Sequence, residues 1–269
     1  MNAADHYLSV PGARLRYRDE GAGAALVLVH GWTLDLDMWE PQAALAANLR
    51  VVRYDRRGFG LSAGFPSLAA DVDDLHALLA ALGIVSPVLV GMSQGARVVL
   101  EFAARHPRMV GGLVLDGVPP LSGTDADDAA DLPMSEFRAA AAQAGLAAFR
   151  TLWSAHPLTH LMTHDPDTQA LLAKILARYP GRDLTAPAPP PRECLDERML
   201  AGIRAPVLIV NGARDIESRR RAGLRLRRAL PTADHAFIEN AAHLPNLDAA
   251  REYNRLLSDF ATRHLPAAA

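Results

Sequence analysis

The sequence predicts an α/β fold, in which a mostly parallel central sheet is flanked by helices and carries an inserted helical cap. Short apolar runs alternate with longer segments of helical periodicity, and most of the apolar runs end in Gly or Asp. These two observations predict the sheet and its helices. A third predicts the cap, because no clear strand pattern occurs between the two halves of the sheet. We therefore expect a core of residues 1–120 and 200–269 and a cap, or lid, of residues 121–199.

The strands are expected where Val, Leu and Ile follow one another without interruption, since such runs are typical of strands buried on both faces. A hairpin comes first, with strands Tyr7–Val10 and Arg14–Arg18 on either side of the Pro11-Gly12 turn. The later strand candidates are Leu26–His30, Arg50–Asp55, Val88–Gly91, Leu113–Asp116, Val207–Asn211 and the weaker His235–Glu239.

Helices are expected between these runs, where apolar residues recur at helical spacing and Gly or Pro marks several of the ends. The core candidates are residues 68–82, 93–106, 217–230 and 246–264, and the cap candidates are residues 134–148 and 167–177. The arginines of residues 217–230 are interpreted as a solvated helix face, with a basic binding patch as the alternative. The Pro-rich residues 185–192 are interpreted as a stiff, extended connector.

Composition excludes several classes of partner. The net charge is −2, so no strong field attracts nucleic acid or an anionic membrane. No apolar run is long enough to span a bilayer, and the N-terminal residues lack the pattern of a leader. The single cysteine, Cys194, cannot form an intrachain disulfide and is interpreted as incidental rather than as a nucleophile. We expect a cytoplasmic protein.

Ser93 is the candidate nucleophile. It lies in Gly91-Met92-Ser93-Gln94-Gly95, which follows an apolar strand and precedes a helix. Small residues on both sides allow a tight, strained turn that lifts the hydroxyl above the sheet, at the positive end of a helix. The alternative is an ordinary Gly/Ser turn, but the strand before and the helix after favour a nucleophile.

A serine hydroxyl is a weak nucleophile and needs a base. His243 follows the last expected strand, and Asp215 follows the strand before it, so both should reach the carboxyl edge of the sheet. The chain order Ser, Asp, His is the order typical of such a triad. Asp116 also ends a strand and is a rival for the role of acid, although we favour Asp215.

Attack on a carbonyl creates an oxyanion, which needs two preorganised donors. One is expected to be the backbone N–H of Gln94, directly after the nucleophile. The other is expected to be the N–H of Trp32, because the preceding His30-Gly31 lets the chain turn inward. His30 itself is interpreted as structural rather than as a second base.

The cap supplies apolar side chains that are candidates for the substrate pocket, with ordinary core packing as the alternative. They are Phe137, Phe149, Trp153, Leu158, Leu161 and Met162. His156, His160 and His164 are spaced by four and would share one helix face. Pro157 interrupts that segment, so we interpret the three histidines as a polar surface and expect no metal site.

The motifs together resemble the α/β-hydrolase superfamily over nearly the whole chain. Those that carry the resemblance are His30-Gly31-Trp32 with Trp39, Tyr54-Asp55-Arg56-Arg57-Gly58-Phe59-Gly60-Leu61-Ser62, Gly91-Met92-Ser93-Gln94-Gly95, Asn211-Gly212-Ala213-Arg214-Asp215 and Ala242-His243. The chain looks like the small esterases, enol-lactonases and carbon–carbon bond hydrolases with a helical cap. The resemblance implies the same nucleophile, acid, base and oxyanion donors. Gln94 departs from the Met or Leu often found there.

The sequence therefore predicts a serine hydrolase that acts on a small to medium carboxylic ester or lactone through an acyl-enzyme, without a cofactor. A carbon–carbon bond hydrolase and a perhydrolase use the same triad and remain alternatives. A ligand-binding receptor on this fold is a third alternative, because fold does not fix function. The expected partner is the small-molecule substrate, and the expected assembly is a monomer or homodimer.

Overall fold

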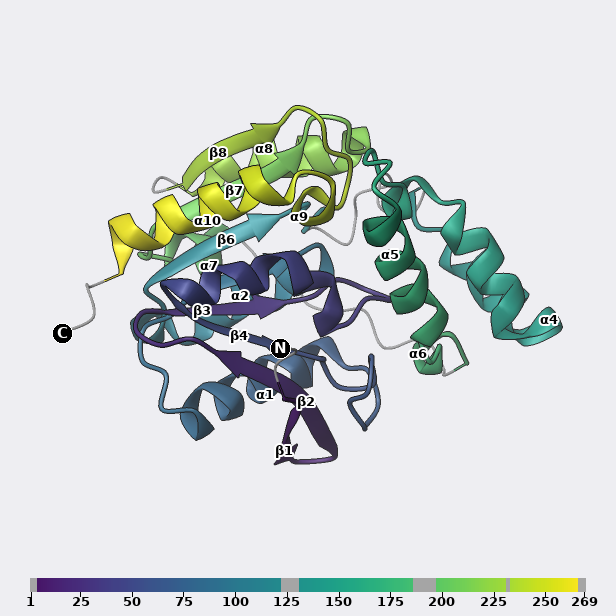
Figure 1. Ribbon diagram of the computed structural model, residues 1–269, viewed down its shortest axis with the longest axis horizontal. Helices are drawn as coiled ribbons and strands as arrows, with labels where there is room; N and C mark the ends of the chain where they lie inside the picture. The colour runs from purple at the N-terminus through teal and green to yellow at the C-terminus, as the bar shows by residue number, and fades with distance from the viewer. Residues whose placement is uncertain (1–3, 122–130, 186–196, 231–232, 266–269) are drawn as a thin grey trace.

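The fold is known from a computed structural model that describes residues 4–121, 131–185, 197–230 and 233–265 (Figure 1). Cys194 and most of the Pro-rich connector lie outside these ranges. The predicted boundaries of the cap adjoin residues 122–130 and 186–196, which are also outside them, so the division into core and cap stays a prediction.

An eight-stranded sheet forms the centre of the molecule, with the order β1-β2-β4-β3-β5-β6-β7-β8. The pairings of β2 with β1 and with β4 are antiparallel, and the others are parallel, which confirms a mostly parallel sheet. The strand bounds are β1 His6–Val10, β2 Ala13–Glu20, β3 Ala25–Val29, β4 Arg50–Tyr54, β5 Val88–Met92, β6 Gly112–Asp116, β7 Val207–Gly212 and β8 Ala233–Ile238.

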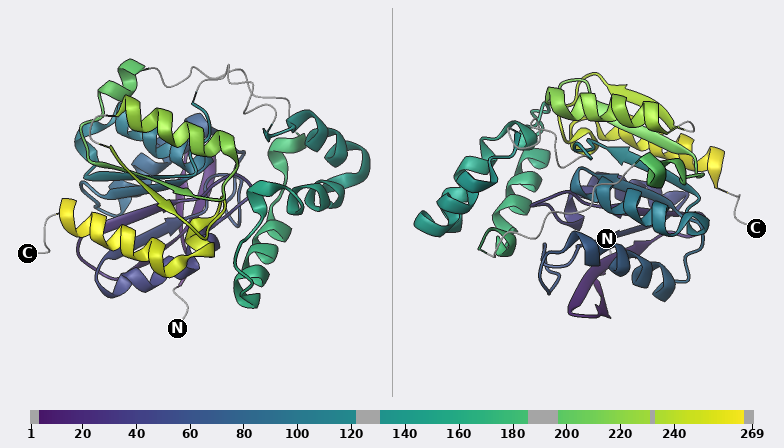
Figure 2. Two further views of the ribbon diagram at one scale, coloured as in Figure 1. Left: turned by 90° about the horizontal axis from the view of Figure 1, so that it is seen from above. Right: turned by 180° about the vertical axis from the view of Figure 1, so that it is seen from behind.

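Successive residues of the central strands point to opposite faces, and each face is buried under its own helices. Leu26 and Leu28 of β3 pack in one cluster, while Val27 and Val29 pack in the other. The first cluster includes side chains of η1 (Leu36–Ala47) and α10 (Ala250–His264). The second includes side chains of α1 (Leu68–Ala81), α2 (Gln94–Arg105) and α8 (Glu217–Ala229), and Figure 2 shows this layering.

Between β6 and β7 the described chain contains helices and no strand. We call α4 (Met134–Ser154), η3 (Pro157–Thr159), α5 (Pro166–Arg178) and α6 (Arg182–Thr185) the inserted helices. They lie beyond the arrowheads of β3 and β6, at the carboxyl ends of the parallel strands (Figure 1). This is the sheet edge where α/β proteins bind ligands.

Some elements differ from the sequence-based expectation. Residues 246–264 form two helices, α9 (Pro245–Asp248) and α10, because Ala249 between them has non-helical angles. Helix α4 extends to residue 154 but is kinked at Gly145, whose φ of 80° and ψ of 172° are not helical. The 3₁₀ segment η1 was not expected, since its apolar residues and Pro41 follow no helical period. Short η2 (Pro107–Met109) and α7 (Glu197–Ala201) complete the described elements.

Candidate active site

Ser93 lies at the tight turn between β5 and α2. Its φ of 51° and ψ of −114° fall in a region that non-glycine residues rarely adopt, so the backbone is strained there. The Ser93 N–H donates to the Asp116 carbonyl at 2.7 Å and thereby ties the turn to β6. Because β5 ends at residue 92 and α2 begins at residue 94, the hydroxyl stands at the carboxyl edge of the sheet.

The two glycines of the turn are required by packing. A Cβ on Gly91 would lie 2.5 Å from the Gly95 carbonyl oxygen, and a Cβ on Gly95 would lie 2.2 Å from the Val29 carbonyl oxygen. Both neighbours are backbone atoms, which cannot move aside without shifting α2 or β3. The Gly-x-Ser-x-Gly spacing is therefore a geometric condition for placing a helix so soon after the strand.

Asp215 and His243 meet at the same edge. Asp215 follows β7, His243 follows β8, and the Nδ1–H of His243 donates to Asp215 Oδ2 at 2.9 Å. Both side chains are buried, and the Ile216 N–H also donates to the other carboxylate oxygen of Asp215 at 2.7 Å. This pairing leaves Nε2 as the imidazole nitrogen that is available to take a proton.

Ser93 and His243 line one pocket. The pocket contains about 360 Å³ of empty space including its mouth, and its walls are Trp32, Thr33, Leu34, Met92, Ser93, Leu132, Trp153, Leu158, Thr159, His243 and Leu244. Among the described residues no hydrogen bond joins the Ser93 hydroxyl to His243. Catalytic hydrogen bonds are often long without substrate and tighten when it binds.

Asp116, the rival acid, lies behind the pair. It is fully buried at the end of β6, and the described hydrogen bonds of His243 lead to Asp215 instead. Burial, reinforced by the negative charge of Asp215, raises the pKa of Asp116 well above its ordinary value. A carboxyl group that holds its proton is poorly suited to stabilise an imidazolium, so the geometry favours Asp215.

The two expected oxyanion donors flank Ser93. Gln94 is the next residue, at the first position of α2. A Cβ on Gly31 would lie 3.4 Å from the Ser93 Cβ and 2.7 Å from the Met92 sulfur, so the peptide that carries the Trp32 N–H passes close to the nucleophile. The absence of a side chain at residue 31 is what allows this approach.

His30 and the Gln94 side chain belong to a buried support beneath the site. His30 Nδ1–H donates to the Gly31 carbonyl at 2.8 Å, and His30 Nε2 accepts from the Arg56 N–H at 2.9 Å. Burial and the charge of Arg56 keep the pKa of His30 well below its ordinary value, so the ring is neutral. The Arg56 guanidinium donates to Gln94 Oε1. Residues 55–62 therefore contact the candidate site through the bonds of Arg56 to His30 and Gln94.

The pocket candidates from the cap divide into three groups. Trp153 and Leu158 line the pocket. Phe137, Phe149 and Leu161 are buried in the core cluster but are not part of the lining, and both phenylalanines pack against Trp32 and Trp153. Met162 is 45% exposed outside the pocket, since its backbone N–H is held by Asp248 at 2.7 Å. These last four residues are not part of the described pocket lining, and their role in binding substrate stays a prediction.

Several lining residues were not among the predicted site residues. Thr33, Leu34 and Leu244 lie within two residues of Trp32 or His243 along the chain, and this position could have indicated them. Leu132 and Thr159 lie on the inserted helical segment with nothing to distinguish them from core residues.

The three cap histidines do not share a helix face. His156 precedes η3, His160 follows it, and His164 precedes α5. Within the described ranges no group of three or more His, Cys, Asp or Glu side chains is placed to hold a metal ion. None of the described helices is both long and apolar enough to cross a membrane.

The profile of the alpha/beta hydrolase fold family matches residues 24–250 of this chain. The chain belongs to the alpha/beta hydrolase fold family. This α/β hydrolase is 30% identical over 267 residues to the 2-hydroxy-6-oxononadienedioate/2-hydroxy-6-oxononatrienedioate hydrolase 2 of Pseudomonas putida, with 92% of this chain and 91% of that protein covered.

Other similar proteins are named for different activities. A putative non-heme chloroperoxidase of Synechocystis sp. is 41% identical over 112 residues, which is 39% of this chain and 40% of that protein. The α/β hydrolase thus spans less than half the length of this relative. Among solved structures, the enol-lactonase of Burkholderia xenovorans LB400 is similar with a TM-score of 0.77 and 25% identity, covering 96% of this chain and 100% of that one. An esterase of Thermogutta terrifontis shares the fold, with a TM-score of 0.82 and 24% identity over 97% of this chain and 100% of the other.

Proposed function

We propose that this α/β hydrolase is a serine hydrolase that cleaves a small, uncharged carboxylic ester or lactone. Ser93 is the nucleophile, His243 the general base and Asp215 the acid that orients the imidazole. The observation that carries this proposal is the shared pocket: a strained serine at a strand–helix turn lies in the same cavity as a histidine whose other nitrogen is bonded to a buried aspartate.

The proposed reaction has two steps. His243 takes the proton of Ser93 Oγ as that oxygen bonds to the acyl carbon, and the Trp32 and Gln94 N–H groups stabilise the negative oxygen. His243 then gives the proton to the leaving alcohol oxygen, which leaves an acyl-enzyme. Water attacks the acyl carbon with His243 again as base, and the Ser93–acyl bond breaks.

The lining of the pocket supports an uncharged substrate. Besides the triad, the described lining side chains are apolar apart from Thr33 and Thr159, and no Lys or Arg is among them. An anionic acyl group would lose its hydration there without gaining a cationic partner. The pocket is small, because even its empty space of about 360 Å³ includes the open mouth, and this supports a small acyl group.

The relative from Pseudomonas putida makes carbon–carbon bond hydrolysis the second candidate, since it covers nearly the whole chain. The substrate in the name of that relative is a dioate, which carries two carboxylates. The absence of Lys and Arg from the described lining weighs against that substrate here. The relation to a chloroperoxidase makes peroxide-dependent oxidation in acetate a third activity to be measured.

Two measurements test the proposal. A fluorophosphonate probe should modify the purified protein once, at Ser93 by peptide mass spectrometry, and Ser93→Ala should not react. A panel of p-nitrophenyl acetate, butyrate and octanoate with a few lactones should show turnover, with short acyl chains preferred. Failure of the probe to react would favour a receptor role, whereas turnover of a meta-cleavage dienoate with poor ester activity would favour carbon–carbon hydrolysis.

A further inference from the structure

The loop that carries the Trp32 N–H is bound on its outer side by the inserted helices. We call residues 31–37, which follow β3 and include the first two residues of η1, the oxyanion loop. The Trp32 indole N–H donates to Asp183 Oδ2 of α6 at 2.6 Å. The Trp153 indole N–H of α4 donates to Thr33 Oγ1 at 2.8 Å. These are two direct bonds between side chains separated by more than one hundred positions in sequence.

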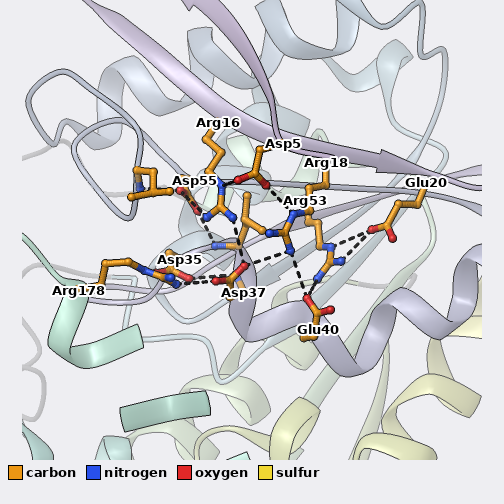
Figure 3. A network of polar contacts seen from close by, with 12 residues as sticks. Asp5, Arg16, Arg18, Glu20, Asp35, Asp37, Glu40, Arg53, Asp55 and Arg178 are labelled. Atoms are coloured by element: carbon orange, nitrogen blue, oxygen red, sulfur yellow. Dashed lines mark hydrogen bonds and ion pairs between the residues drawn. The ribbon is translucent and has the colours of Figure 1, made fainter. Parts of the chain in front are cut away.

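A third tether is ionic and is drawn in Figure 3, where Arg178 of α5 reaches the oxyanion loop. Arg178 Nε and Nη2 donate to Asp35 Oδ2 at 2.9 and 2.6 Å, and Nη2 also donates to Asp37 Oδ2 at 2.7 Å. Asp35 is nearly fully buried, so its contact with Arg178 replaces hydration that the carboxylate has lost.

The loop needs such support because its backbone is strained. Thr33 has φ = 64°, which is uncommon for a residue branched at Cβ, and its side chain is buried. The Thr33 hydroxyl donates to the Trp32 carbonyl at 2.6 Å while it accepts from Trp153. A strained conformation persists only where its surroundings fix it, and here part of those surroundings belongs to the inserted helices.

Aromatic packing holds the same loop from the same side. The Trp32 ring lies 4.9 Å from Trp153, 5.8 Å from Phe149 and 6.1 Å from Tyr179, centroid to centroid. The Tyr179 hydroxyl donates to Asp183, which orients the carboxylate that receives the Trp32 N–H. The side chain of the residue that supplies the oxyanion donor is therefore surrounded by the inserted helices.

We propose that Asp183 and Arg178 are positioning residues that hold the Trp32 N–H in the oxyanion hole. This inference rests on the proposed function. It assigns the inserted helices a second task besides lining the pocket: one oxyanion donor is in place only while they are docked on the oxyanion loop. Neither residue is expected to touch the substrate, since neither lines the pocket.

The variants are chosen to separate positioning from stability. Asp183→Ala removes the acceptor of the Trp32 indole, while Asp183→Asn keeps an acceptor oxygen at that place. Arg178→Met removes the ionic tether. Arg150→Met is the matched control, because Arg150 of α4 donates to the Tyr179 carbonyl at 2.9 Å and, among the described hydrogen bonds, makes none to the oxyanion loop.

The readout is the rate constant for phosphonylation of Ser93 by a fluorophosphonate, together with kcat and KM for a short p-nitrophenyl ester and the Tm. In that probe reaction Ser93 Oγ bonds to phosphorus, fluoride leaves, and the phosphoryl oxygen occupies the oxyanion hole. Rates are divided by active sites, counted from the burst of nitrophenol. Loss of one complete oxyanion donor costs about 10² to 10³ in kcat, which sets the upper limit for a displaced donor.

We expect Asp183→Ala and Arg178→Met to lower both the phosphonylation rate constant and kcat by about tenfold or more, with KM within about threefold. Asp183→Asn should recover most of the loss, and Arg150→Met should keep the wild-type rate constants. Wild-type rate constants in Asp183→Ala and Arg178→Met, with a Tm lowered as in Arg150→Met, would overturn the inference but not the proposed function. A wild-type protein that forms no adduct at Ser93 would overturn both.

If Asp183→Ala does not fold, Trp32→Phe gives the same information. It removes the indole N–H but keeps an aromatic ring at that place and the backbone N–H. The same tenfold loss supports the inference, and an unchanged phosphonylation rate constant overturns it.

Discussion

At the scale of single residues, two buried carboxyl groups lie at the candidate site, and the described hydrogen bonds join only Asp215 to His243. Asp215 is bonded to His243, whereas Asp116 lies buried behind it, and burial raises the pKa of Asp116 well above its ordinary value. The ionisation of one buried carboxyl group raises the free energy needed to ionise a second one near it. The hydrogen bond to His243 therefore distinguishes Asp215 from Asp116, and substitution of each residue tests this difference.

Asp215→Asn should therefore lower kcat by about 10⁴-fold, because the amide favours the wrong imidazole tautomer and cannot stabilise the imidazolium. Asp116→Asn replaces a neutral carboxyl by a neutral amide and should leave kcat within about tenfold of wild type. Steady-state hydrolysis of a p-nitrophenyl ester by the two variants makes the comparison. An inactive Asp116→Asn beside an active Asp215→Asn would transfer the acid role to Asp116.

Sequence reasoning identified the triad candidates because each stands at the end of a recognisable strand or in a short motif. Trp153 and Phe149 show where that reasoning ended. Both are buried apolar residues of one helix, four positions apart, and only Trp153 lines the pocket, so helical spacing could not separate the two. Arg178 gave no signal, since its partners Asp35 and Asp37 lie more than 140 residues away.

At the scale of elements, the junction of β5 and α2 is limited by backbone contact. Gly95→Ala would place a Cβ 2.2 Å from the Val29 carbonyl oxygen, so β3 and α2 must separate. We expect the free energy of unfolding to fall by about 1–3 kcal/mol or more, as for other overpacked sites, and activity to fall with it. Urea unfolding followed by circular dichroism measures the change.

Gly83→Ala is the matched control for that experiment, because nothing lies within 4 Å of its Cβ position, although its φ is +61°. Its cost should be limited to the left-handed backbone, about 1–2 kcal/mol, with activity retained. Equal activity of the two variants would show that the β5–α2 junction tolerates more displacement than these distances allow.

Helix α4 owes its bend to Gly145. The angles there, φ 80° and ψ 172°, belong to a region that is essentially open to glycine alone, and a Cβ would meet no atom within 4 Å. Gly145→Ala should therefore destabilise through backbone conformation and not through collision, by about 1–3 kcal/mol in urea unfolding. Unchanged or increased stability would mean that α4 can straighten without loss of its contacts.

At the scale of the whole molecule, a buried charge network joins the N-terminal hairpin, η1, β4 and α5 (Figure 3). Asp55 lies within it, where its carboxylate accepts from the Leu36 N–H at 2.7 Å and the Leu61 N–H at 2.8 Å. Burial, reinforced by the neighbouring Asp35, raises the pKa of Asp55 to about 7. The network therefore makes stability depend on pH.

An acid with a higher pKa in the folded than in the unfolded state binds its proton more tightly when folded. Its contribution to the free energy of unfolding is therefore present at low pH and is lost as the pH rises from about 4 to about 7. Asp55→Asn cannot titrate. The stability of wild type minus that of Asp55→Asn should fall between about pH 4 and about pH 7 in urea unfolding. A difference that stays constant or grows with pH would contradict the assignment.

The wrapping of Trp32 by α4, α5 and α6 also limits how the protein can be recombined. The loop that bears Trp32, Asp35 and Asp37 comes early in the chain, whereas Trp153, Arg178 and Asp183 come from the insertion. A chimaera that exchanged only the insertion for that of a relative would remove the hydrogen-bond partners of the Trp32 indole and of the Asp35 and Asp37 carboxylates. An exchange of the insertion between relatives therefore has to include residues 31–37, so that both sides of each contact come from the same protein.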